Sequence, residues 1–111
     1  MKRLYLGEFE EIVLLTVGVL YTKAYAVAIK EEIAEQTGRN VNISAVHTAL
    51  YRLEEKGFLE SKLGDAEARR GGKRKRLFTI TTLGRKVLVE TMELRQKIWA
   101  QIPKPALGFS Y

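Results

Sequence analysis

The residues with the strongest chemical character lie in the stretch RRGGKRKR, which spans positions 69–76. Six of its eight residues are basic, and 19 Lys and Arg against 13 Asp and Glu leave a net charge of +6, so the rest of the chain is neutral. Guanidinium and ammonium groups on a glycine-containing loop suit a phosphate backbone. A solvated loop that binds nothing specific is the alternative for a basic run taken alone. The predicted phosphate contacts are Arg69, Arg70, Lys73, Arg74 and Lys75.

A predicted helix between Asn42 and Gly57 carries a second set of chemically useful side chains. One side has the i, i+3, i+4, i+7 spacing of a buried stripe, formed by Val46, Ala49, Leu50 and Leu53. The other side offers hydroxyl, imidazole and guanidinium groups for base edges and phosphates, and a methyl group that suits thymine. An ordinary solvent-facing side is the alternative for each residue taken singly. We expect base contacts from Ser44, Ala45, His47 and Thr48, and backbone contacts from Tyr51 and Arg52.

Residues for catalysis, metal binding or cofactor binding are scarce. His47 is the only histidine, Asp65 is the only aspartate, and the chain has no cysteine. His47 follows Ser44 by three residues, but a Ser-His pair on a helix surface has no acid to orient it and no oxyanion pocket. Gly71 and Gly72 lie between predicted strands, unlike the glycines of a phosphate-cradling loop before a helix. We therefore expect no enzyme activity, no metal and no cofactor.

Three predicted helices and a hairpin make up the first part of the chain. Apolar residues at helical spacing predict helices over 8–20 and 26–37, ahead of the helix described above. Two strand-type segments, FLESKL from Phe58 and RLFTI from Arg76, flank the basic loop and predict a hairpin. This order is that of a winged helix-turn-helix, in which the third helix enters the DNA major groove and the hairpin is the wing.

A final helix is predicted from about Leu83 to Ile102, with Thr81 or Thr82 as its cap. The expected fold class is mainly α with a small β hairpin: a winged helix-turn-helix plus a C-terminal dimerisation helix. We expect 1–82 to form the DNA-binding domain and 83–111 to form the dimerisation helix and tail, together one compact unit. The alternating apolar residues of the tail predict an extended segment.

The first and last helices are more apolar than one small domain needs. Since a chain of 111 residues buries a modest core, we expect a second copy to cover the surplus, with each last helix packed on the partner's first helix. Packing of the entire band within one chain is the alternative. Trp99 also suits the floor of a ligand pocket near the two-fold axis. The predicted dimer interface comprises Leu14, Leu15, Val19, Leu88, Met92, Leu94, Ile98, Trp99 and Ile102.

The sequence pattern predicts a cytoplasmic protein without membrane contact. Glu8, Glu10 and Glu11 interrupt the first apolar run too early for a signal peptide, and no uncharged stretch of about 18 residues offers a membrane span. The absence of cysteine is compatible with a reducing compartment.

Three sequence segments resemble the PadR family of bacterial transcriptional regulators. They are LGEFEEIVLL in the first helix, ALYRLEEKGFLE from Ala49 and ITTLGR from Ile80, and the resemblance covers about Leu6 to Leu88 with a basic wing in between. It implies a dimeric repressor with a winged helix-turn-helix and a C-terminal dimerisation helix, which binds a double-stranded, two-fold DNA operator.

Two positions depart from the pattern of this family. The family often has a tyrosine where this chain has His47, and its YGYEI-like segment reads AYAVAI from Ala24. A single final helix resembles the short PadR branch, some of whose members bind drug-like aromatic molecules around a tryptophan between subunits. That resemblance implies a small aromatic effector near Trp99. The alternative functions are therefore a small-molecule-sensing, multidrug-type regulator and a basic RNA-associated protein.

Overall fold

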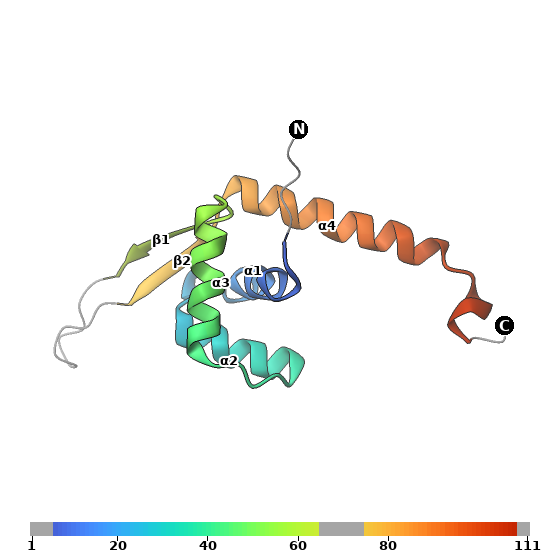
Figure 1. The fold of residues 1–111 in the computed structure, drawn as a ribbon. Coiled ribbons are helices and arrows are strands. Elements are labelled where there is room, and N and C mark those ends of the chain that lie inside the picture. The colour runs from blue at the N-terminus through green and yellow to red at the C-terminus, as the bar shows by residue number, and fades with distance from the viewer. Residues whose placement is uncertain (1–5, 65–74, 109–111) are drawn as a thin grey trace.

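The computed structural model of the chain describes residues 6–64 and 75–108. The two strands pair antiparallel, from Leu59 opposite Ile80 to Leu63 opposite Arg76. The predicted fold class is confirmed, because a mainly helical winged helix-turn-helix is followed by one long helix (Figure 1). The elements, with η for 3-10 helices, are α1 (Glu8–Leu20), η1 (Tyr21–Lys23), α2 (Ala26–Thr37), α3 (Ile43–Glu55), β1 (Leu59–Leu63), β2 (Arg76–Ile80), α4 (Thr82–Gln101) and η3 (Lys104–Leu107).

Helices α1, α2 and α3 enclose one apolar core together with the base of the hairpin. The stripe predicted for α3 is buried as expected, and Phe58 and Phe78 are the largest fully buried side chains. Each helix therefore buries one face, which orients the opposite face of α3 toward solvent. The core residues are Val13, Leu14, Val17, Ala24, Ile29, Ile33, Val46, Ala49, Leu50, Leu53, Phe58, Leu59 and Phe78.

The turn between α2 and α3 is built from local signals in the sequence. Gly38 has φ 73°, a left-handed conformation that suits glycine, and its N–H donates to the Ala34 carbonyl. The Asn42 side chain then accepts a 2.8 Å hydrogen bond from the Ala45 N–H, which caps α3. These two residues define where α2 ends and how α3 begins.

The hairpin is attached to the start of α2 as well as to the core. The Phe78 N–H donates to the Ala24 carbonyl at 3.0 Å, and Tyr25 forms an isolated antiparallel bridge with Leu77. The base of the hairpin is therefore held by backbone hydrogen bonds from a third segment. These contacts help to fix the direction of the hairpin relative to α3.

Helix α4 begins against the core and then leaves it. The Thr81 hydroxyl accepts from the Gly84 N–H at 3.0 Å and donates to the Gly57 carbonyl at 2.6 Å. Gly84 lies so close to Phe58 that an added Cβ would be 2.1 Å from the Phe58 carbonyl oxygen. Leu88 packs against the core, but the second half of α4 extends away on the opposite side from the hairpin (Figure 1).

Two sequence-based expectations are corrected by the structure. Leu14, which we placed in a dimer interface, is fully buried because it fills the core between α1 and its neighbours. The tail residues up to Gly108 do not run extended, because Lys104–Leu107 form η3 and Gly108 has φ 82°. None of the helices described has the length and apolarity needed to cross a membrane.

Candidate nucleic-acid interface

The outward face of α3 carries the side chains predicted to contact DNA. Ser44, His47, Thr48, Tyr51 and Arg52 are exposed on the side opposite the buried stripe, and Ala45 is half-buried at its edge. Because side chains three and four residues apart meet on a helix, these residues form one continuous surface. We call these six residues the α3 face.

Two contacts within the α3 face restrict its side chains. The rings of His47 and Tyr51 stack with centroids 6.2 Å apart and planes at 25°. The Thr48 hydroxyl donates to the Ser44 carbonyl at 3.0 Å, so its oxygen remains available as an acceptor. The face thus presents a paired imidazole and phenol beside an oriented hydroxyl.

The end of α3 is fixed to the start of α1 by an ion pair. Lys56 Nζ lies 2.6 Å from Glu10 Oε1, and the same oxygen accepts from the Gly7 N–H at 3.0 Å. Burial would raise the pKa of Glu10, but hydrogen bonds from Lys56 and Gly7 and the charges of Lys56 and Arg52 outweigh it and lower the pKa. Glu10 therefore stays ionised and holds both elements.

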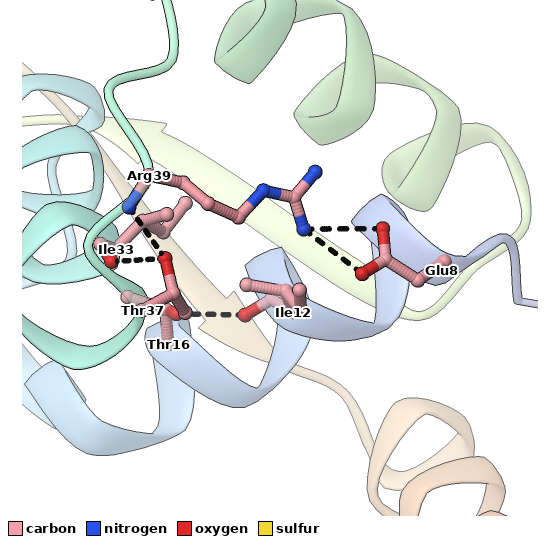
Figure 2. A network of polar contacts seen from close by, with 6 residues as sticks. All are labelled: Glu8, Ile12, Thr16, Ile33, Thr37 and Arg39. Atoms are coloured by element: carbon pink, nitrogen blue, oxygen red, sulfur yellow. Dashed lines mark hydrogen bonds and ion pairs between the residues drawn. The ribbon is translucent and has the colours of Figure 1, made fainter.

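The turn between α2 and α3 is held to α1 by a separate network around Arg39, which Figure 2 shows. Arg39 Nη1 donates to both oxygens of Glu8, at 2.9 and 3.2 Å, and its backbone N–H donates to the Thr37 hydroxyl at 3.1 Å. Its guanidinium carbon also lies 5.5 Å from the centre of the Phe9 ring. Sequence reasoning missed Arg39, because the partners of its side chain lie on α1, about thirty positions earlier, and no local pattern indicates them.

Only part of the basic stretch lies within the described residues. Lys75 is exposed, with Nζ 5.7 Å from the centre of the Tyr25 ring. Arg76 Nη1 donates to the Ser61 hydroxyl, which itself donates to Glu54. Arg76 thus links the hairpin to α3. The other predicted phosphate contacts, Arg69, Arg70, Lys73 and Arg74, lie outside the described residues.

The residues predicted for a dimer interface lie on two helices and differ in exposure. On α1, Leu15 and Val19 are exposed. On α4, Leu88 and Met92 are half-buried, whereas Leu94, Ile98 and Trp99 are exposed, Trp99 to 57%. Ile102, which directly follows α4, is half-buried. The apolar band therefore continues along α4 beyond the part that packs on its own core.

An open groove separates the first turn of α1 from α3. Its walls include Phe9, Glu10, Thr48 and Arg52. Trp99 does not line this groove. Within residues 6–64 and 75–108, no group of three His, Asp or Glu side chains is arranged to hold a metal ion.

Several solved structures share this architecture. A complex structure of hsRosR-S1, from the H. salinarum protein RosR, is 25% identical over 87% of this chain and 79% of that chain, with a TM-score of 0.71. A PadR-like transcription factor from Bacteroides fragilis is 19% identical over 81% of this chain and 82% of that chain, with a TM-score of 0.67. Bacillus subtilis PadR in complex with operator DNA is 18% identical over 77% of this chain and 46% of that chain, with a TM-score of 0.63.

The fold and these likenesses define a winged helix-turn-helix protein. The model of the transcriptional regulator PadR-like family matches residues 14–90, which is more than half of the chain, so the protein belongs to that family. The resemblance found in the sequence is confirmed. Because this is a family of transcriptional regulators and not of enzymes, the prediction against catalysis is confirmed as well. A comparison with curated protein sequences gave no match.

Proposed function

We propose that this protein is a homodimeric transcriptional repressor that places α3 in the major groove of a two-fold DNA operator. The observation that carries the proposal is the α3 face, whose exposed polar side chains lie directly opposite a fully buried stripe. A helix held in this way enters the major groove with its outward side chains against base edges. The operator-bound Bacillus subtilis PadR, which shares the fold, supports DNA as the partner.

The residues of the α3 face take different roles along the helix. Ser44, Ala45, His47 and Thr48 lie near the start of α3, where base edges are contacted, and we assign them to base readout. Tyr51 and Arg52 lie further along and contact phosphates, which position the helix without reading sequence.

The wing supplies the electrostatic part of binding. Lys75 belongs to the basic stretch and is exposed directly before β2, and we assign Arg69, Arg70, Lys73, Arg74 and Lys75 to phosphate contacts. Each phosphate neutralised releases counterions, which makes the affinity fall steeply with salt. The wing therefore adds affinity and the α3 face adds specificity.

The dimer contact uses the apolar band that α4 carries beyond its own core. Ile98 and Trp99 are both more than half exposed, so a partner that covers them removes apolar surface from water, which favours association. Leu15 and Val19 on α1 offer a matching exposed surface. We assign 1–82 to DNA binding and 83–111 to dimerisation, with α4 covering α1 of the partner.

Selection from random duplex DNA tests this function. The purified protein is incubated with the library at about 0.15 M salt, where surface charge is already screened. We expect the selected DNA to share a motif of two inverted half-sites. When the protein is added, in vitro transcription from a promoter that overlaps this motif should fall. Recovery of no motif, or preference for structured RNA at equal salt, would contradict it.

A small aromatic effector is a second candidate property, favoured by one observation. Trp99 is the only tryptophan, and its indole is exposed on the apolar side of α4. In the proposed dimer this indole lies at the interface, where a planar aromatic molecule would stack on it. Tryptophan fluorescence measured with a panel of planar aromatic compounds tests this, and no quenching by any of them would count against it.

A further inference from the structure

The first turn of α1 carries three glutamates, and each holds a cation from a different part of the fold. Glu8 pairs with Arg39 before α3, and Glu10 pairs with Lys56 after α3. Glu11 pairs with Arg95 on α4. One helix turn therefore contacts the turn before the proposed recognition helix, the residue that follows that helix, and the proposed dimerisation helix.

The pair between Glu11 and Arg95 has the geometry of a fixed contact. Arg95 Nη2 and Nε donate to the same carboxylate oxygen, at 3.0 and 3.3 Å. The Glu11 side chain is 14% exposed and the Arg95 side chain is 63% exposed, so water is largely kept from the carboxylate but reaches the guanidinium. Two donors on one guanidinium also fix its orientation better than a single ammonium would.

Arg95 lies at the place where α4 leaves its own chain. By helical spacing it follows Gly84, Leu88 and Thr91 along the inward side of α4. Residues 93–101 are all exposed, so Arg95 lies beyond the apolar contacts that attach α4 to the core. Ile98 and Trp99, which the proposed partner covers, come directly after it.

The position of Arg95 determines how firmly the direction of α4 is fixed. The apolar attachment from Gly84 to Leu88 covers about 6 Å of helix, whereas Gly84 to Arg95 covers about 16 Å at the standard rise. If each contact allows the same small displacement, a helix that is held over a longer part of its length can change its angle less. The pair should therefore reduce the angular freedom of α4 by more than half.

We propose that Arg95 and Glu11 are positioning residues that set the angle between α4 and the winged helix, and thereby the distance between the two α3 faces of the dimer. This inference rests on the homodimer of the proposed function. A tilt of about 10° over the roughly 30 Å of α4 moves a domain by about 5 Å, which exceeds the 3.4 Å rise of one base pair. The pair thus selects the spacing of the half-sites.

Electron–electron distance measurement on the labelled dimer tests this inference. The chain has no cysteine, so Glu35→Cys on the exposed end of α2 introduces a single site for a nitroxide label. Two labels in the dimer report the distance between the domains, and the width of the distribution reports their angular freedom. We expect Arg95→Gln and Glu11→Gln each to widen the distribution about twofold.

The controls separate positioning from general loosening. Glu8→Gln makes the same change in the same helix turn but breaks the pair with Arg39, so the width should not change. The exchanged pair Glu11→Arg/Arg95→Glu should return the width toward that of the unchanged pair. The thermal midpoint of every variant is measured in parallel.

Three results would overturn the inference. One is an unchanged width in Arg95→Gln, and another is equal widening in Glu8→Gln, which would indicate nonspecific loosening. The third is loss of the dimer in Arg95→Gln, which would assign the pair to association. Absence of dipolar coupling with the Arg95 pair intact would instead contradict the homodimer itself, so the two failures are distinguishable.

Discussion

Glu10 shows how a single carboxylate connects two elements of the interface. It is buried, it accepts from the Gly7 N–H and it pairs with Lys56 after α3. Hydrogen bonds to a charged group contribute more than neutral ones, and a buried charge that loses its partner is costly. The position of α3 therefore depends on the ionised form of Glu10.

The lowered pKa of Glu10 predicts a pH-dependent contribution to stability. A carboxyl whose folded pKa lies below its ordinary value stabilises the fold above that ordinary value, and the contribution is lost as pH falls through the folded pKa. Glu10→Gln should lower the free energy of unfolding by about 1 to 3 kcal/mol at pH 7. Urea titrations between pH 3 and 7 should show this difference vanishing toward low pH.

The control for this prediction is Glu8→Gln, because the Glu8 side chain is 71% exposed. An exposed pair contributes little, so the free energy of unfolding should change by less than about 1 kcal/mol. If Glu10→Gln lowers the free energy of unfolding by the same amount at every pH between 3 and 7, the role assigned to the charge of Glu10 is wrong.

At Gly84, the addition of a single methyl group should strongly lower the free energy of unfolding. An alanine Cβ there would lie 2.1 Å from the Phe58 carbonyl oxygen and 3.0 Å from its carbon, so α4 or the backbone at Phe58 must move. Gly84→Ala should lower the free energy of unfolding by about 3 kcal/mol, as overpacking does. At Gly18, also helical, a Cβ would meet only the Ile80 Cδ1 at 3.3 Å, so Gly18→Ala should be neutral or stabilising. Equal unfolding midpoints of the two variants in urea would contradict the close packing at Gly84.

At the scale of elements, the wing and α3 are expected to contribute different parts of binding. Neutral replacement of Lys73, Arg74 and Lys75 by glutamine should flatten the plot of log affinity against log salt, by up to about 0.9 per phosphate lost. Sequence preference should be retained, because base contacts belong to α3. Fluorescence anisotropy on the selected operator across a salt series measures both.

A matched loss of charge elsewhere is the control for the wing. Arg85, Lys86 and Lys97 are exposed on α4, so their replacement by glutamine removes the same charge away from the wing. The salt slope of this variant should stay close to that of the unmodified protein. Equal slopes for the two triple variants would show that net charge, and not the wing, determines the salt dependence.

The sequence predicts these elements well where the signal is local. Caps at Asn42 and Thr81, the left-handed Gly38 and the apolar stripe of α3 all lie within a few residues of the structure they specify. Contacts between distant segments carry no such pattern. The pairs made by Arg39 and Arg95 join segments that only the packing of α1 brings together.

The correction at Leu14 has the same physical origin. Spacing along α1 shows that several sides of the helix are apolar, but it does not say which side meets α2 and α3 and which stays exposed. The structure buries Leu14 and leaves Leu15 and Val19 exposed. Whether the α3 face binds DNA stays a prediction, because exposure shows that the residues are accessible and not what they contact.

At the scale of the whole molecule, α4 and the hairpin extend from the core in opposite directions, and the molecule measures 61 × 36 × 21 Å (Figure 1). Ile98 lies on the inward side of α4 and is 54% exposed, so Ile98→Glu should place a charge in the proposed dimer interface. We expect this variant to sediment as a monomer and to bind the two-fold operator at least tenfold more weakly. Analytical ultracentrifugation and anisotropy measure these two effects.

The matched control is Ala100→Glu, which adds the same charge to the exposed opposite side of α4. It should sediment and bind as the unmodified protein does. If Ile98→Glu remains a dimer, or if both variants dissociate, the proposed use of the apolar band is wrong.

The central claim is that the α3 face reads base sequence. The measurement that tests it most directly is the affinity for the selected operator with each base pair replaced in turn, for the unmodified protein and for His47→Ala. We predict that His47→Ala removes the preference, worth about 1 to 3 kcal/mol, at one pair of symmetric positions and leaves the others intact. Gln96→Ala on α4 should leave every position unchanged. The claim would be contradicted if His47→Ala, Ser44→Ala and Thr48→Ala each lowered the affinity equally for every operator and left the preference at all base-pair positions unchanged.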